Sequence, residues 1–300
     1  MVCMLSIIIP HRRCVYVEKT IQSLLDGAEG EIEIIVHVDE PAPKEKEVKD
    51  PRVHYYYSLS PIGMRAGINV GLSKAKGEYI MKTDDHCVFA KGYDTVLNEM
   101  SYDWLVVPRR YSLHADNWDR DLRMPIKDYH YLSWPKVYSN YGYCMFPQEW
   151  KERTRERMRG YDIDDTMSIQ GSCYLANKDY FMKLVGYLDD RAETYSTFSG
   201  EQLEVGLKYW LGGGEVKVNK NTWYAHLFKN KKYYVGNRQD RDYKKELKTL
   251  AGWDWAAKHW MRDEEPKMVH KMKWLVNKFW PIPGWPVKWE ELWNTPNFVK

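Results

Sequence analysis

The residues best suited to chemistry are three neighbours, Asp84, Asp85 and His86, which follow directly on an apolar run that ends at Lys82. If that run is a strand, Asp84 and His86 leave the same face of the chain, because side chains two residues apart in an extended backbone point the same way. A carboxylate and an imidazole on one face can share a divalent cation. This ligand pair suits Mn²⁺ or zinc better than Ca²⁺, which prefers oxygen ligands alone. The alternative is a polar turn with solvated side chains.

The elements that would position this cluster are short apolar runs separated by segments of helical periodicity. A strand, a helix and a second strand within about forty residues form a βαβ unit, which predicts adjacent parallel strands. Open sheets of this kind bind ligands at the carboxyl ends of their strands, and Pro10 and Asp39 both lie at such ends. The predicted strands are Leu5–Ile9, Glu33–Val38, Val53–Tyr57 and Glu78–Lys82, and the predicted helices are 15–25 and Met64–Lys74.

The rest of the chain is less regular. A strand predicted at Trp104–Val107 leads into residues 109–168, an aromatic and Arg-rich stretch that we interpret as a loop-rich insertion covering a site. The tail from residue 229 onward is predicted to form helices and Pro-rich turns that pack on the core or on a partner. Regularity returns at Gln170–Leu175, with helices from about Lys178 and over 199–210 and closing strands at Glu215–Val218 and Thr222–His226.

Composition allows a globular enzyme and narrows its setting. The 300 residues include 44% hydrophobic residues, enough for a core, and the formal net charge is only +3. Charge is uneven, because residues 229–300 carry 16 Lys and Arg against 9 Asp and Glu, together with 8 of the 14 Trp residues. The five cysteines are scattered without a CxxC pair, so neither a disulfide framework nor a zinc ribbon is expected. Because no apolar run reaches about eighteen residues, we expect a cytoplasmic protein without a membrane span.

A larger pattern joins these segments. In the order and spacing of its motifs the chain resembles the family 2 glycosyltransferases, and more closely still the catalytic core of the polypeptide N-acetylgalactosaminyltransferases. The resemblance covers about residues 4–228. The motifs are Ser6-Ile-Ile-Ile-Pro10, Asp39, Gly63-Met-Arg65, Lys74-Ala-Lys-Gly77, Asp84-Asp-His86, Gly200-Glu-Gln-Leu-Glu204 and Trp223-Tyr-Ala-His226.

The resemblance implies a fold, a division of the chain and a reaction. The fold would be α/β of the GT-A, Rossmann-like type, with a mostly parallel central sheet that binds a nucleotide sugar. Residues 1–228 would form the catalytic domain, with 109–168 as an acceptor-side insertion, and residues 229–300 a basic, Trp- and Tyr-rich helical extension. The reaction would move a sugar from a UDP-sugar to an acceptor hydroxyl, with Mn²⁺ or Mg²⁺ offsetting the charge that develops on the diphosphate leaving group.

The implied metal ligands are Asp84, His86 and His226. His226 rests on the resemblance alone, since a lone histidine after a strand is usually structural. Asp85 completes the donor side, either as a partner of the metal ligands or as a contact to the donor sugar. Lysines of the tail such as Lys229, Lys231 and Lys232 could add positive charge near the leaving group, although a solvated basic surface is the alternative.

Three further residues match positions around the nucleotide in the resembling families. Pro10 and Asp39 match the places that cradle the base and the ribose, and Arg65 matches a basic residue that lines the nucleotide site. The alternatives are an Asx-type turn for Asp39 and a solvated helix position for Arg65.

Glu201 and Gln202 bear on the stereochemistry of transfer. Inverting members of family 2 place an aspartate near this position as the base that deprotonates the acceptor. An amide cannot act as a general base, so either Glu201 takes that role or no base is needed. The retaining N-acetylgalactosaminyltransferases have Glu-Asn at the matching place, which Glu201-Gln202 resembles. We therefore expect retention of configuration, with Glu201 and Gln202 as the catalytic pair.

The acceptor is predicted from the insertion and the basic tail. Arginines beside aromatic rings suit stacking on sugars, and equally on bases and phosphates. The chain also resembles phage-borne transferases, some relatives of which glycosylate hydroxymethylated pyrimidines in DNA. The favoured acceptor is therefore a 5-hydroxymethylpyrimidine, such as hydroxymethylcytosine, in phage DNA. The residues of the insertion behind this expectation are Arg109, Arg110, Trp118, Tyr129, Tyr131, Trp134, Tyr138 and Tyr141.

Other functions stay open beside this one. A cell-surface polysaccharide or glycan is the main alternative acceptor. A nucleotidyltransferase could share the nucleotide-binding half of the fold. A non-catalytic protein that binds a nucleotide sugar or nucleic acid is a more distant alternative.

Overall fold

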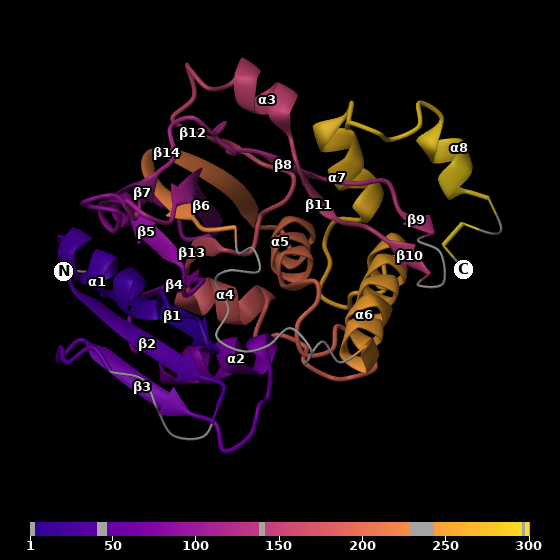
Figure 1. Cartoon of the computed structure of the whole chain (residues 1–300). Coiled ribbons are helices and arrows are strands. Elements are labelled where there is room, and N and C mark those ends of the chain that lie inside the picture. Colours follow the sequence, from indigo (N-terminus) through magenta and orange to yellow (C-terminus); the bar gives the residue numbers. More distant parts are fainter. Residues whose placement is uncertain (1–3, 41–46, 138–141, 229–242, 296–297, 300) are drawn as a thin grey trace.

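The structure, a computed structural model, describes residues 4–40, 47–137, 142–228, 243–295 and 298–299, with the backbone alone over 243–250. The N-terminal third contains the predicted βαβ units. Its elements are β1 (Leu5–His11), α1 (Val17–Gly27), β2 (Ile32–Val38), β3 (Val53–Tyr57), α2 (Met64–Lys74) and β4 (Tyr79–Thr83). These four strands are parallel and lie in the order β4-β1-β2-β3 (Figure 1).

Strand β1 is apolar throughout because both of its faces are covered. Ile7 and Ile9 pack with Ile21 of α1 in one core cluster, whereas Ile8 packs with Ile68 of α2 in a second cluster on the other face. A strand buried on both sides reads as a continuous apolar run and shows no alternation. Because β1, β2 and β4 are parallel, their carboxyl ends lie along one edge of the sheet, which is where such sheets bind ligands.

The sheet continues beyond β4 with strands from the second half of the chain. Its order is β12-β14-β6-β13-β4-β1-β2-β3, and β5 and β7 pair with β14 and β6. The bounds are β5 (Cys87–Phe89), β6 (Trp104–His114), β7 (Asp119–Arg120), β12 (Ile163–Asp165), β13 (Cys173–Asn177) and β14 (Glu215–His226). The two closing strands predicted from the sequence form the single strand β14, with a shift of register between Asn219 and Trp223.

One detail of the predicted sheet needs correction. The sequence predicted a mostly parallel sheet, but the sheet is mixed, since β13 runs antiparallel to both β4 and β6. The direction of β1, β2 and β4 follows from helical crossovers. Strand β13 is instead reached through the long insertion, so no crossover of that kind imposes a parallel direction. Three helices complete this part of the fold: the 3-10 helix η1 (Thr95–Glu99) and the α-helices α4 (Lys178–Leu184) and α5 (Glu201–Leu211).

The insertion contains more regular structure than its sequence indicates. It contains two small antiparallel sheets and a short helix, which lies near the top of Figure 1. Three of the aromatic side chains that were expected to face an acceptor contribute to the core instead: Tyr129 is buried, Tyr131 packs against the same cluster, and Trp134 packs edge-on against Trp285 of the tail. Tyr138 and Tyr141 lie outside the described residues. The elements are β8 (His130–Leu132), β9 (Lys136–Val137), β10 (Tyr143–Cys144), β11 (Pro147–Glu149) and α3 (Lys151–Glu156).

The tail shares a hydrophobic core with the rest of the molecule. It forms α6 (Tyr243–Met261), α7 (Met272–Phe279) and α8 (Trp289–Trp293), which lie beside α5 and the insertion (Figure 1). Trp260 and Trp285 are buried in the same cluster as α5, and their indole N–H groups donate to Tyr195 Oη at 2.6 Å and to the Leu132 carbonyl at 2.7 Å. In the part of the chain that the structure describes, no helix has the length and apolar character needed to cross a membrane.

Candidate active site

Asp84, His86 and His226 come together at one edge of the sheet. Asp84 follows β4, His86 precedes β5, and His226 ends β14, the antiparallel partner of β5. Nε2 of His226 lies 3.2 Å from Asp84 Oδ2, and Nε2 of His86 lies 3.9 Å from the same oxygen. Ligand atoms at right angles around a cation with bonds of about 2.1 Å are about 3 Å apart, so the spacing fits a cation of the size of Mg²⁺ or Mn²⁺. The two imidazoles suit Mn²⁺ better than Mg²⁺, and they suit zinc as well.

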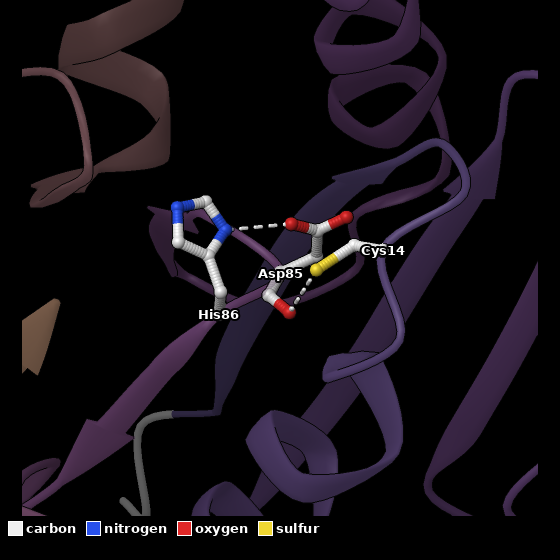
Figure 2. Close-up of side chains that lie close together, drawn as sticks. All are labelled: Cys14, Asp85 and His86. Atoms are coloured by element: carbon white, nitrogen blue, oxygen red, sulfur yellow. Dashed lines mark hydrogen bonds and ion pairs between the residues drawn. The ribbon is translucent and has the colours of Figure 1, made fainter. Parts of the chain in front are cut away.

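Asp85 orients two histidines beside this cluster. Its Oδ1 accepts from Nδ1 of His86 at 2.7 Å, and its Oδ2 lies 2.8 Å from Nδ1 of His11. Figure 2 shows the first of these contacts, with the second ring nitrogen of His86 pointing away from Asp85. A carboxylate on one nitrogen sets the tautomer, leaving the lone pair of Nε2 for a metal. Cys14 lies on the other side of Asp85, with Sγ 3.5 Å from its carbonyl oxygen.

Lys82 is a residue of this site that the sequence analysis missed. Its buried ammonium donates to Asp84 Oδ1 at 2.8 Å, to the Gly171 carbonyl at 2.6 Å and to Glu201 Oε2 at 3.2 Å. Burial alone would lower the pKa of Lys82, but Asp84 and Glu201 outweigh it and raise the pKa. A signal was present, because Lys82 stands two residues before Asp84 and so leaves the same face of β4.

The charges around the cluster are set by these contacts. Burial would raise the pKa of Asp84, but Lys82 and the two histidines outweigh it and hold the pKa well below its usual range, so this carboxylate is ionised. Burial lowers the pKa of His226 to about 4, against the opposing effect of Asp84. At neutral pH the site therefore offers an ionised carboxylate and a neutral imidazole, the forms in which both groups bind a metal.

A cavity of about 510 Å³ opens beside the cluster, within the usual size range of ligand pockets. Asp84, His86 and His226 line it together with Pro10 and Asp39, and Phe198 and Phe228 line it as well. Asp85 lines it too, so the structure brings six of the predicted site residues to one cavity.

Asp39 anchors the loop in front of α2. Its carboxylate accepts from the backbone N–H of Ile62 at 2.5 Å and of Gly63 at 3.1 Å. These contacts link residues more than twenty positions apart, so Asp39 is not the local Asx-type turn considered from the sequence. Gly63 has a φ of +94°, and a Cβ there would come within 2.5 Å of the Thr197 side chain, so the loop needs glycine at this position.

Arg65 requires a correction. The resemblance placed it in the nucleotide site, but its side chain is 0% exposed and is not among the described residues that line the cavity. Its guanidinium forms an ion pair with Glu204 and donates to the carbonyls of Asp189 at 2.7 Å and Ser199 at 2.8 Å. The reason is that Arg65 points from α2 towards Glu204 of α5. Among the described residues, Glu204 forms ion pairs with Arg65 and with Lys208.

The predicted catalytic pair sits behind the metal cluster. Glu201 is buried at the start of α5 and pairs with Lys82, and burial raises its pKa against the opposing effect of Lys82. Gln202 lies beside Gly171. Neither residue belongs to the described lining of the cavity. Lys229, Lys231 and Lys232 lie outside the described residues.

Comparison with known proteins bears on the whole arrangement. The profile of "Glycosyl transferase family 2" matches residues 6–185. Polypeptide N-acetylgalactosaminyltransferase 9 of Macaca fascicularis is 30% identical over 128 residues, which is 41% of this chain and 19% of that protein. The same enzyme of Homo sapiens is 30% identical over 123 residues, 40% of this chain and 18% of that protein. The chain therefore spans about a fifth of the length of these relatives.

A solved structure supports the fold over a longer stretch. The crystal structure of GalNAc-T7 with UDP, GalNAc and Mn²⁺ superposes with a TM-score of 0.65 at 14% identity, covering 87% of this chain and 50% of that one. The predicted GT-A type of α/β fold is thereby confirmed, since this likeness extends well beyond the 6–185 segment that the family profile matches.

Proposed function

The chain belongs to glycosyl transferase family 2, and we propose that it moves a sugar from a UDP-sugar to an acceptor hydroxyl with a divalent cation held by Asp84, His86 and His226. The observation that carries this proposal is the convergence of these three side chains, from β4, the start of β5 and the end of β14, on the wall of one cavity. The cation and the nucleotide sugar are proposals for this chain, supported by the donor set and by the GalNAc-T7 structure with UDP and Mn²⁺.

The chemistry demands positive charge at the leaving group. Breaking the bond between sugar and phosphate leaves UDP with about three negative charges, and a bound cation supplies the charge that stabilises it. The protein's own part is to hold the ligands. Lys82 fixes one oxygen of Asp84, which leaves the other directed at His226, and Asp85 fixes the ring of His86.

The nucleoside is proposed to lie against the part of the cavity that Pro10 and Asp39 line. Both residues stand at the carboxyl ends of neighbouring parallel strands, the place where open sheets bind nucleotides. Asp39 already accepts two backbone N–H groups, but each carboxylate oxygen has a second acceptor position for a ribose hydroxyl.

Transfer is proposed to proceed with retention of configuration. Glu201 is paired with Lys82 behind the metal ligands, and Gln202 is an amide, so neither side chain is placed to accept a proton from an acceptor in the cavity. Glu201 then serves to position Lys82 and, through it, Asp84. The anomeric configuration of the product, read by NMR, tests this assignment, and a product of inverted configuration overturns it.

Donor hydrolysis tests the reaction class, the metal and the donor together. A panel of UDP-sugars is incubated with Mn²⁺, with Mg²⁺ and with EDTA, using wild type, Asp84→Asn and the control Asp119→Asn, whose side chain is 64% exposed. We expect hydrolysis with Mn²⁺, none in EDTA, and a loss of at least about 100-fold in Asp84→Asn only, since the charge of a ligand to the cation is lost. Undiminished activity in EDTA contradicts the metal assignment, and transfer of a nucleotidyl group in place of UDP release contradicts the reaction class.

The acceptor that we propose is a 5-hydroxymethylpyrimidine in DNA, such as hydroxymethylcytosine of a phage genome, with a cell-surface glycan as the alternative. The support is the basic character of residues 229–300 and the arginines of the insertion. Tyr129, Tyr131 and Trp134 of the insertion do not add to this support, because they lie in the hydrophobic core or pack against it. Assays with hydroxymethylcytosine and hydroxymethyluracil DNA across the UDP-sugar panel test the proposal. Transfer to an oligosaccharide acceptor alone, with little dependence on salt, supports the glycan instead.

A further inference from the structure

Arg110 is a buried cation with unused hydrogen-bond donors. It lies on β6, is 4% exposed, and its Nη2 approaches Nε2 of His130 at 3.4 Å. Within the described part of the chain, its Nε and Nη1 atoms have no hydrogen-bond partner. A guanidinium taken out of water without partners costs free energy, so such an arrangement is maintained only where something else compensates it.

The surroundings of Arg110 are more positive than negative. Lys127 is its neighbour, since the Lys127 backbone N–H donates to the Arg110 carbonyl at 3.0 Å. Burial and then Arg110 lower the pKa of Lys127, and burial followed by these two cations lowers the pKa of His130 well below its usual range. Glu149 is in register with His130 across β8 and β11, and its carboxylate acts to raise the pKa of both Arg110 and Lys127. Its Oε1 atom has no described hydrogen-bond partner. Among the described residues, therefore, one carboxylate faces two cations, and Lys151 adds a third nearby positive charge.

This cluster borders the proposed active site. Strands β6 and β14 are parallel, with Arg110 in register with Tyr224 and Ser112 in register with His226, so Arg110 lies on the face of the sheet that carries the metal ligand. Phe228 connects the two regions. Its ring lies 5.1 Å from the ring of His226, and it is approached by the Arg110 guanidinium at 5.4 Å and by Lys127 Nζ at 4.2 Å. Phe228 is half-exposed and lines the cavity.

We propose that Arg110 and Lys127 bind an oxyanion carried by the acceptor, a phosphate or a carboxylate, beside Phe228. This inference rests on the proposed function, because it names the acceptor chemistry of that site. The excess of positive charge favours an anion as the ligand. A neutral sugar hydroxyl would not need this excess, because a balanced pair of Arg and Glu could bind it. The diphosphate of the donor already has a charge partner in the divalent cation proposed at Asp84, His86 and His226, so the Arg110 and Lys127 cations beside Phe228 are left for the acceptor.

Phosphate binding tests the site without requiring catalysis. Inorganic phosphate is titrated by calorimetry in EDTA, at an ionic strength held constant with chloride, into wild type, Arg110→Met, Lys127→Gln and the control Lys136→Gln, an exposed lysine of β9. We expect saturable binding to wild type and to the control, and affinity weaker by about tenfold or more in each of the two other variants, because each loses a charge-assisted hydrogen bond. Lys127 is only half-buried, so Lys127→Gln keeps the test valid if Arg110→Met does not fold.

A second measurement separates the acceptor from the donor as the source of the anion. Hydrolysis of UDP-glucose and UDP-glucuronate with Mn²⁺ is compared in wild type and Lys127→Gln. An unchanged ratio of the two rates supports an anion on the acceptor, whereas a selective loss of UDP-glucuronate hydrolysis places it on the donor sugar and overturns the inference. If wild type hydrolyses the donor but binds phosphate no better than chloride, the inference about the acceptor is overturned and the proposed function stands. Phosphate binding without hydrolysis of any donor counts instead against the proposed function.

Discussion

Two arginines, Arg65 and Arg110, are both hidden from water but differ in their partners. Arg65 pairs with Glu204, donates to two carbonyls and stacks over the ring of Tyr195 at 4.3 Å. Arg110 has one long contact, to His130, and two nitrogen atoms without a described partner. The contrast teaches that burial of a charge does not reveal its role. A cation whose donors are all used holds the fold together, whereas one with donors left over beside a cavity is suited to a ligand.

The same contrast extends to the regions around them. At the carboxyl ends of β1, β2 and β4 the buried charges are compensated internally, as Asp85 is by two histidines and Lys82 by two carboxylates. Around Phe228, the described residues include the cations of Arg110 and Lys127 and one opposing carboxylate, that of Glu149. The first region is therefore expected to respond to mutation through stability and metal affinity, and the second through ligand binding.

The largest effect is expected when Arg65 is replaced. Arg65→Met leaves the buried Glu204 with only Lys208 as a cationic partner among the described residues, and we expect the free energy of unfolding to fall by about 3 to 5 kcal/mol. Urea denaturation followed by circular dichroism measures this change. Lys74→Met, at an exposed position of the same helix, is the matched control and should change stability by no more than about 0.5 kcal/mol. Equal urea midpoints for wild type and Arg65→Met would contradict the stabilising role assigned to Arg65.

Asp85 offers the next largest effect, on metal affinity. In Asp85→Ala the rings of His11 and His86 lose the carboxylate that orients them, so the affinity for Mn²⁺ is expected to fall by about 10- to 100-fold. Titration calorimetry with Mn²⁺ measures it. The exposed carboxylate of Asp26 provides a control in Asp26→Ala, and an Asp85→Ala protein with the affinity of wild type contradicts the orienting role.

Asp39→Ala should have a smaller effect on stability. The backbone N–H groups of Ile62 and Gly63 lose their acceptor, and the free energy of unfolding is expected to fall by about 1 to 3 kcal/mol. The affinity for UDP in the presence of Mn²⁺ should fall as well, because the loop that Asp39 anchors borders the cavity. Unfolding in urea and calorimetry with UDP measure the two effects, and unchanged UDP affinity argues against a nucleoside at this wall.

The smallest change in stability is expected for Arg110→Met, in sharp contrast to Arg65→Met. Removing a buried cation that lacks partners should leave the free energy of unfolding within about 1 kcal/mol of wild type, or raise it. The same urea experiment measures it. A destabilisation as large as that of Arg65→Met would show that Arg110 has structural partners after all, and the contrast between the two regions would disappear.

Much of the N-terminal half of the fold was predictable from local pattern. The bounds of β3 (Val53–Tyr57) and α2 (Met64–Lys74) agree with those predicted, and β1, β2 and β4 differ only at their ends. The reason is that repeated βαβ units couple a local hydrophobic period to a definite crossover, so pattern and topology carry the same information. The insertion lacks such a period, and its short strands gain their stability from contacts with the tail, as in the bond from Trp285 to the Leu132 carbonyl.

The candidate site divides in the same way. Asp84 and His86 are close in sequence, so a local pattern could pair them, although the chain bends at Asp85 and His86 where an extended backbone was expected. Lys82 could have been found from its place two residues before Asp84. Contacts between residues that are far apart in the sequence could not be predicted in this way. The bond between Lys82 and Glu201, which are 119 residues apart, is an example. The same holds for the ion pair of Arg65 and Glu204, 139 residues apart.

The sequence by itself determined which residue types stand at the ends of the first strands, and thereby the kind of site this protein builds. That information is local, because the alternation of side chains along a strand decides which of them share a face. Only the tertiary structure brought His226, which the resemblance implied, beside Asp84, paired Arg65 with Glu204 in the core, and left Nε and Nη1 of Arg110 without a described partner. The physical reason is that the cost of burying a charge depends on every group packed around it, and those groups come from strands and helices far apart in the chain.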